Sequence, residues 1–386
     1  MSRGLELAVM FFAAHYLAKA VYGDLEYSKK VLEVGGIFLS FGFPVLMLTY
    51  TRSQKSKIYL LAYAVMFVLL LATGLAFIAY WFHFHRYVPG IMFYALFFSG
   101  GIFPAYILVR YGSDKASLYK IFFSLLYWGL ILSFILYYTH PENSFLVVAG
   151  GLLIPGMAFI AWELRRNDFR TDIFGKYIRH YRKLLYGSLA LVLSNFTNIM
   201  FLYTDIFVIR YFSPRPQIDI ADYSFSLNGA NVLMLIPFTL VQVDIHHLKF
   251  KERYYRILQK RIGILTLAGV VFLIGAYWVL IHYGVPKYGN TFGLFLLILT
   301  AKFFQAQGVL FGTGIVILKK YSLNLKINIF ILILNVMLNI VLFKTAGLYG
   351  IALASAFSLL LRYGLLFYFY RKYLPPGKGI TENENH

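Results

Sequence analysis

Long apolar segments recur along the chain, and short polar or basic stretches separate them. A helix needs about 20 apolar residues to cross the hydrocarbon core of a bilayer. The first segment is the weakest, because Glu6, His15 and Lys19 interrupt it, and it lacks the small-residue cleavage site of a signal peptide. The pattern predicts twelve membrane spans, at 4–22, 31–50, 58–82, 88–109, 118–138, 144–163, 185–209, 223–245, 262–283, 289–317, 325–343 and 347–370.

Lysine and arginine gather in alternate connecting segments. With the N-terminus in the cytoplasm, the inner segments hold 26 of the 36 basic residues, the outer ones 7 and the spans 3. Cytoplasmic loops of membrane proteins carry such an excess, so both ends are predicted to be cytoplasmic. The net charge of +20 then follows from topology and suits anionic lipid head groups. Nucleic-acid binding is not expected.

The composition supports a membrane protein. Apolar residues make up 60% of the 386 positions and charged residues 13%, against roughly 45–50% and 25% in soluble domains. The absence of cysteine from the sequence excludes disulfides, zinc–thiolate sites and thiol catalysis. The sequence also lacks a G-x-x-x-x-G-K-[ST] loop and an H-E-x-x-H motif, so no cofactor is expected.

Two similar halves are predicted on either side of a basic segment. Glu26-Tyr27-Ser28 precedes the span that contains Pro44, and Asp222-Tyr223-Ser224 precedes the span that contains Pro237. Parallel repeats that hold a substrate between them are a transporter architecture. The predicted fold is an all-α membrane protein with about twelve spans in two six-helix bundles. Its parts are an N-terminal bundle (1–163), a basic cytoplasmic interfacial linker (164–184), a C-terminal bundle (185–374) and a polar cytoplasmic tail (375–386).

Polar residues share one face in five spans of the second half, at about 100° per residue around each helix. A single asparagine is equally well explained by hydrogen bonding between helices. Coherent faces in five spans favour a shared water-filled cavity. These faces comprise Ser188, Asn195, Asn198 and Asp205; Ser224, Asn228, Asn231 and Gln242; Lys302, Gln305 and Thr313; Asn324, Asn328, Asn335 and Asn339; and Ser355, Ser358 and Arg362.

Charged residues inside the spans need partners. A lysine or arginine that faces lipid costs about 2.5–3.5 kcal/mol, so Lys302 and Arg362 are expected to face protein or water. They either pair with Asp205 or Asp244, or line a cationic cavity that receives an anionic group. The candidates for binding a coupling proton or Na⁺ are Asp205, Asp244 and Glu33.

Several of these stretches resemble one transporter superfamily, the multidrug/oligosaccharidyl-lipid/polysaccharide exporters. The similarity is to the bacterial polysaccharide flippases that move O-antigen or capsule repeat units. It lies in Asp205 followed by apolar residues, an acid-Tyr-Ser stretch before the next span, and a Gly-x-x-Gly-Ile-Ala stretch in the last span. The residues concerned are 204–209, 222–224, 236–237 and 347–355, with 27–28 and 42–44 in the first half.

The resemblance implies a flippase of the bacterial inner membrane that works by alternating access. It would turn an undecaprenyl-diphosphate-linked oligosaccharide from the cytoplasmic to the periplasmic leaflet. The implied partners are this substrate, membrane lipids, Na⁺ or H⁺, and polysaccharide-assembly enzymes. The diphosphate would bind cations, and the sugars would bind neutral amides. The cations are Lys302, Arg362, Arg52 and Lys19, and the amides are Asn195, Asn198, Asn228, Asn231, Gln305, Asn335 and Asn339.

Two other functions are considered. A multidrug cation antiporter of the same superfamily predicts a more acidic cavity, and Lys302 with Arg362 argues against it. A membrane glycosyltransferase or polymerase would use the acidic pair Asp24 and Glu26 in the first predicted outer loop. Such enzymes usually carry a large outer domain, for which the predicted loops leave no room. A transporter rather than an enzyme is therefore expected.

Overall fold

Helices form the regular structure of the described chain. The computed structural model describes residues 2–50, 53–82, 84–98, 100–167, 169, 171–248, 252–318 and 320–373, and every regular element within them is helical. The predicted all-helical class is confirmed. The chain divides into two compact units, Met1–Ile199 and Met200–His386.

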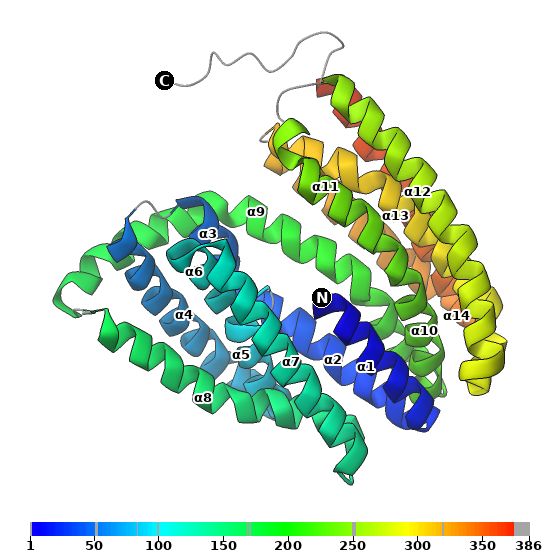
Figure 1. The fold of residues 1–386 in the computed structure, drawn as a ribbon, viewed down its shortest axis with the longest axis horizontal. Coiled ribbons are helices and arrows are strands. Elements are labelled where there is room, and N and C mark those ends of the chain that lie inside the picture. Colours follow the sequence, from blue (N-terminus) through cyan, green and yellow to red (C-terminus); the bar gives the residue numbers. More distant parts are fainter. Residues whose placement is uncertain are drawn as a thin grey trace. The chain divides into compact units, whose positions relative to one another are not determined.

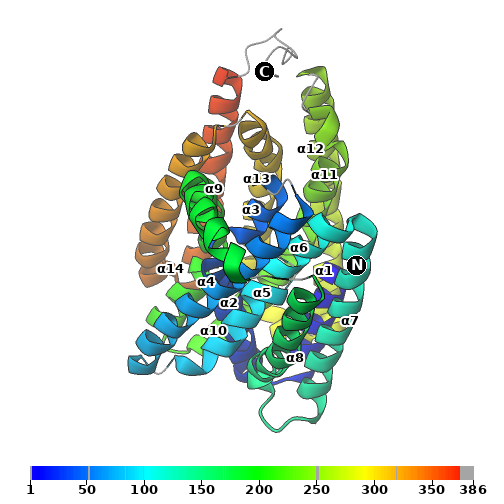
Figure 2. The same ribbon diagram turned by 90° about the vertical axis from the view of Figure 1, so that its left-hand side faces the viewer.

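The first unit is built around a short central helix, α5, which ends at Phe97 and is followed by α6. In both ribbon views (Figures 1 and 2), α5 lies against α2, α4 and α8. The helices are α1 (Ser2–Tyr16), α2 (Lys19–Ser40), α3 (Phe43–Tyr50), α4 (Gln54–Trp81), α5 (Val88–Phe97), α6 (Ile102–Tyr111), α7 (Ser113–Tyr137), α8 (Ser144–Arg166) and the first part of α9 (Thr171–Phe212), with 3₁₀ turns at His85–Tyr87 and Pro141–Asn143.

The second unit contains the longest helix. Its elements are the end of α9, α10 (Pro216–Asn231), α11 (Leu235–Leu248), α12 (Glu252–Val279), α13 (Phe292–Ile317) and α14 (Tyr321–Tyr373), with short helical turns at Val232–Met234, Leu280–Gly284 and Pro286–Thr291. α14 is interrupted at Gly347, whose φ of 58° and ψ of −136° are not helical. The break divides α14 into two stretches, 321–346 and 348–373.

The second stretch of α14 runs parallel to α13. Gly293, Gly308 and Gly314 of α13 lie beside Tyr349, Tyr363 and Tyr370 of α14 in the same order. The two helices therefore keep a constant register, in which position 302 of α13 is level with position 358 of α14. Figure 1 shows α13 and α14 side by side within this unit.

Eight helical segments of the described chain are long and apolar enough to cross a membrane. They are Ser56–Trp81, His85–Tyr111, Ser113–Tyr137, Pro141–Arg166, Pro216–Val241, Tyr255–Gly284, Pro286–Ile317 and Tyr321–Tyr373. The count of twelve spans and the cytoplasmic position of both ends stay predictions.

The prediction of an outer loop at residues 23–30 is wrong, because these residues are helical. Residues 23–30 lie inside α2, and Glu26, Lys29 and Lys30 are buried there. Hydropathy places these charges outside the membrane, because it does not register that Lys29 pairs with Glu6 of another helix. In the second half, the acid-Tyr-Ser stretch at 222–224 likewise lies within α10.

Part of the predicted basic linker forms the start of a long helix. α8 ends at Arg166, and residues 171–184 begin α9. The ring of Tyr177 stacks on Tyr59 with centroids 4.4 Å apart, and the Tyr181 hydroxyl donates to the carbonyl of Ser56 over 2.6 Å. These contacts attach the start of α9 to α4 within the first unit. Its position at a membrane interface stays a prediction.

Candidate functional site

A buried carboxylate, Asp205 of α9, is the centre of a polar cluster in the second unit. Its Oδ1 accepts from the amide of Asn339 at 2.7 Å and from that of Asn335 at 3.3 Å. Its Oδ2 accepts from the Ser355 hydroxyl at 2.8 Å and from the Tyr223 hydroxyl. Three helices, α9, α10 and α14, thus converge on one side chain that is only 5% exposed.

The break in α14 brings its two stretches to the same carboxylate. Asn335 and Asn339 are four residues apart and share one face of the first stretch, and Ser355 comes from the second. Gly347 adopts a positive φ that glycine accepts without strain. At Gly350 a Cβ atom would lie 2.0 Å from the carbonyl oxygen of Leu342, so a larger residue would separate the stretches.

Two amide oxygens beside Asp205 lack partners. The Oδ1 atoms of Asn335 and Asn339 are buried and accept no hydrogen bond from the described residues. Buried polar atoms in native structures are nearly always paired. A half-turn of either amide about its last torsion would present its oxygen to the carboxylate side. Together with Asp205 and Ser355, these oxygens form the kind of donor set that a hard cation such as Na⁺ prefers.

A small pocket adjoins the cluster. Its volume is about 20 Å³, which is room for roughly one water molecule or small ion. It cannot hold a sugar. The polar residues in its lining are Asp205, Tyr223, Lys302 and Ser355, and the apolar ones are Phe201, Leu227, Ile298, Ala301 and Leu359.

Lys302 and Arg362 belong to neighbouring helices, α13 and α14. Lys302 is 6% exposed, and its ammonium donates to Gln305 Oε1 over 3.1 Å. The parallel register of α13 and α14 places it level with Ser358, one turn from Arg362, which is about 6 Å along the axis. The Ser358 hydroxyl and the Arg362 Nε are buried without a hydrogen-bond partner among the described residues. This face of the unit thus offers two cations and unused donors.

The remaining predicted site residues are more dispersed. Asn228 is buried on α10, Asn231 is half-buried at its end, and Lys19 is half-buried at the start of α2 in the first unit. Arg52 lies outside the described residues. The side chains of Asn195, Asn198 and Asp244 are also outside the described part, although their backbones belong to α9 and α11.

Glu33 belongs to a separate charge cluster in the first unit. The Lys29 ammonium lies 2.5 Å from Glu6 and 3.7 Å from Glu33, and Lys30 lies 3.2 Å from Glu33. The ammonium of Lys29 also lies over the ring of Trp128, 5.8 Å from its centroid. Two lysines thus pair with Glu6 and Glu33, and Glu26, buried on the same helix, also interacts with both lysine charges.

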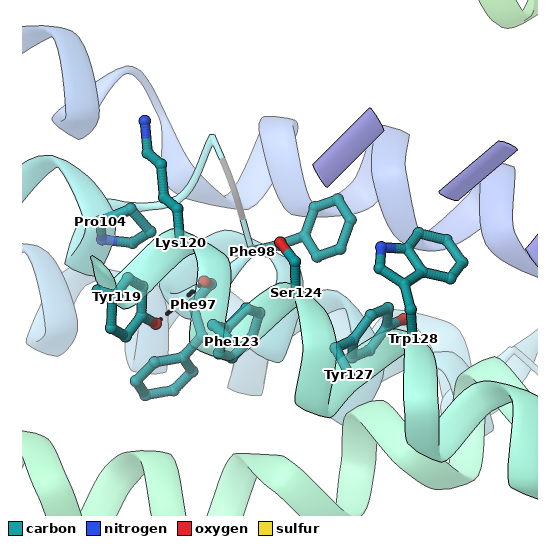
Figure 3. A pocket seen from close by; sticks show the side chains of 9 residues that line it. All are labelled: Phe97, Phe98, Pro104, Tyr119, Lys120, Phe123, Ser124, Tyr127 and Trp128. Carbon is teal, nitrogen blue, oxygen red and sulfur yellow. Dashed lines mark hydrogen bonds between the residues drawn. The ribbon is translucent and has the colours of Figure 1, made fainter. Parts of the chain in front are cut away.

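A second pocket, in the first unit, has an aromatic lining (Figure 3). Its volume is about 10 Å³, and it lies where α5 ends and α6 begins. The Tyr119 hydroxyl donates to the carbonyl of Phe97 over 3.4 Å, and Lys120 directs its nitrogen away from the rings. Phe97, Phe98, Pro104, Tyr119, Lys120, Phe123, Ser124, Tyr127 and Trp128 line it. Its size indicates packing around the helix break rather than a ligand site.

Tyr223 and Ser355 are site residues that the sequence did not assign. Both stand in conspicuous stretches of the sequence, the acid-Tyr-Ser stretch and the polar face of the last span. What it could not supply was their common partner, since Tyr223 and Ser355 meet only at Asp205. The available signal was that each of these two predicted spans carries a hydroxyl residue together with other polar side chains.

The fold is shared with known membrane transporters. A structure described as the lipid II flippase MurJ in an inward closed conformation matches 96% of this chain and 86% of its own, with a TM-score of 0.72 at 14% identity. An inward-facing multidrug resistance MATE family transporter of the MOP superfamily matches 96% and 94%, with a TM-score of 0.62 at 13% identity. A MATE structure in complex with MaL6 matches 96% and 93%, with a TM-score of 0.51 at 12% identity.

This chain has the MATE and MurJ fold. At these identities the likeness concerns the fold, and with the eight apolar segments it makes the chain a multi-pass membrane protein. No protein-family model matches the sequence, and no curated protein does.

Proposed function

We propose that this chain is a flippase for an undecaprenyl-diphosphate-linked oligosaccharide in the bacterial inner membrane. The observation that carries the proposal is the pair of basic residues Lys302 and Arg362 on adjacent parallel helices. The helix register sets them about one turn apart, and Ser358, one turn before Arg362, has an unused donor. Phosphate oxygens accept strong, charge-assisted hydrogen bonds from such groups. The MurJ likeness supports a flippase, since that relative is described as one.

The neutral amides complete the proposed substrate path. Sugars need hydrogen-bond partners without charge, and Gln305 and Asn228 lie in the same unit as the two cations. The other predicted substrate-binding residues are Arg52, Lys19, Asn195 and Asn198 of the first unit and Asn231 of the second, and their part in binding stays a prediction. The lipid tail would remain in the bilayer while alternating access moves the head group.

We place the coupling cation at Asp205. Asp205 would supply the negative charge, and Asn335, Asn339 and Ser355 the neutral oxygens. Two unpartnered amide oxygens favour Na⁺ over a proton, because a proton on Asp205 would satisfy at most one of them. Glu33 is a poorer candidate, since the ammonium groups of Lys29 and Lys30 already lie beside its carboxylate.

A second candidate is a multidrug cation antiporter. Two of the structural relatives are MATE proteins, one of them described as a multidrug resistance transporter, and a buried Asp205 would attract a cationic drug. Lys302 in the lining of the same pocket would repel that drug.

A reconstituted transport assay tests both functions. The full chain in proteoliposomes, with a Na⁺ gradient, should move a fluorescent diphosphate-linked oligosaccharide lipid between leaflets. The Lys302→Met/Arg362→Met double variant should lose at least about tenfold in rate, because each contact to a phosphate is charge-assisted. Lys344→Met, which removes an exposed lysine of α14, serves as the matched control. Full activity of the double variant contradicts the proposal, and expulsion of cationic dyes without lipid movement favours the antiporter.

A further inference from the structure

We propose that Lys302 is the alternative counter-ion of Asp205, so that its ammonium and a free monovalent cation compete for this carboxylate. The inference rests on the proposed function in one respect, namely that a cation binds at Asp205. It assigns Lys302 a positioning role that links the cation to the anionic substrate.

The two charges face one small space. Asp205 and Lys302 line the same pocket of about 20 Å³ and are 5% and 6% exposed. The other residues in that lining are neutral, with Tyr223 and Ser355 as the polar ones. Opposite charges that line one small pocket and are shielded from water interact more strongly than they would in solvent.

The pocket lining contains both residues that donate to Oδ2 of Asp205 and neither of the amides that donate to Oδ1. Tyr223 and Ser355, which donate to Oδ2, are in the pocket lining with Lys302. Asn335 and Asn339, which donate to Oδ1 and carry the unpartnered oxygens, are not. Lys302 therefore has access on the Oδ2 side, while a free cation has its oxygen ligands on the Oδ1 side.

The Lys302 ammonium and a free cation compete because of their charge, not because they would occupy the same position. Asp205 with one cation is neutral, whereas Asp205 with both would leave a net positive charge in a buried site, which is costly. In the structure the Lys302 ammonium donates to the neutral Gln305, one turn along the same helix. It thus has a second partner to which it can turn when a cation occupies Asp205.

The same exchange would couple the cation to the substrate. Lys302 is level with Ser358 and one turn from Arg362, where the proposed diphosphate would bind. Cation binding at Asp205 would release Lys302 for that anion, and by thermodynamic reciprocity the anion would raise the cation affinity by the same factor. Coupling of this kind is typically about 5- to 150-fold.

The test is the Na⁺ affinity of the full chain, measured from the Na⁺-dependent shift of its thermal unfolding at constant ionic strength. Lys302→Met should raise the affinity by about tenfold, within the usual coupling range, and Lys302→Arg should leave it within about threefold. Lys344→Met is the control for removal of an exposed lysine. Inorganic pyrophosphate should strengthen Na⁺ binding in the unmodified chain and not in Lys302→Met.

The outcomes separate this inference from the proposed function. A Na⁺ affinity that depends on Asp205 but is unchanged or weaker in Lys302→Met overturns the competition and leaves the cation site. If neither the unmodified chain nor Asp205→Asn binds Na⁺, both the competition and the proposed cation site at Asp205 are overturned. If Lys302→Met does not accumulate, Lys302→Gln replaces it. Failure of both neutral variants to fold in saturating Na⁺ also overturns the inference, since Na⁺ should then replace the ammonium.

Discussion

Individual buried charges in this chain are stabilised in two different ways. Asp205 receives four neutral hydrogen-bond donors and keeps a net negative charge within its immediate partners. Lys29 is held by the carboxylates of Glu6 and Glu33 and is neutralised. The first carboxylate has no lysine or arginine among its hydrogen-bond donors, whereas the carboxylates of the second cluster already have lysines as partners.

Asp205→Asn should abolish stabilisation by Na⁺, because the amide removes the only charge that the cation would neutralise in the cluster. A site at 100 times its Kd contributes about 2.7 kcal/mol to the free energy of unfolding. Thermal unfolding of the detergent-solubilised chain with and without Na⁺ measures this. Asp114→Asn, at an exposed position of α7, should retain the Na⁺ response of the unmodified chain. A persisting Na⁺ response in Asp205→Asn would place the cation elsewhere.

Lys29→Met should destabilise the chain by about 3 kcal/mol or less, because it leaves the half-buried carboxylates of Glu6 and Glu33 without this counter-ion. The Glu6→Gln/Lys29→Met double variant should recover part of the loss, since Lys30 still pairs with Glu33. The comparison uses midpoints of thermal unfolding, with Lys120→Met as an exposed control. Equal midpoints for Lys29→Met and the unmodified chain would show that the ion pair is not needed.

At the scale of elements, the interruption of α14 is decisive for the site. An unbroken helix would carry Ser355 about 24 Å beyond Asn339, at 1.5 Å per residue. In the structure both side chains bond to Asp205. Gly347 and Gly350 permit this return, one through its positive φ and the other through its close approach to Leu342.

Gly350→Ala should separate the two stretches of α14, because the added Cβ would lie 2.0 Å from a carbonyl oxygen that cannot move alone. We expect a lower unfolding midpoint and a weaker Na⁺ response. Gly364→Ala is the matched control on the same helix, where a Cβ meets nothing within 4 Å. That variant should be neutral or gain up to about 1 kcal/mol from helix propensity. Equal behaviour of the two variants would contradict this account of the break.

At the scale of the whole molecule, membrane orientation determines which way the proposed substrate moves. The distribution of lysine and arginine predicts that the connection at Gly112, between α6 and α7, is cytoplasmic. It predicts that the connection between α7 and α8, near Thr139, is outside. Both connections are exposed in the structure.

Cysteine labelling can test this orientation directly, since the chain contains no cysteine. Thr139→Cys should react with a membrane-impermeant maleimide in intact cells with a permeable outer layer. Ser113→Cys should react only after the inner membrane is opened, because positive loops are retained in the cytoplasm. The reversed pattern would invert the topology and with it the direction of the proposed transport.

Much of the architecture could be predicted because a bilayer imposes a simple rule on sequence. A helix in lipid must be apolar over about 20 residues, so segments such as α4, α7 and α8 stand out from hydropathy alone. The same rule makes exceptions conspicuous. Asp205, Lys302 and Arg362 were found in this way, as charges in apolar runs.

What hydropathy could not supply was which charges are paired. Lys29 and Lys30 look like loop residues along the chain, and only the packing of α1 against α2 makes them part of a buried helix. Asp205 alone is a candidate site, but its partners lie 18, 130, 134 and 150 residues away. The sequence by itself thus determined the helical membrane class and the charges that need an explanation. The tertiary structure decided their partners, because pairing depends on contacts between helices that no local pattern records.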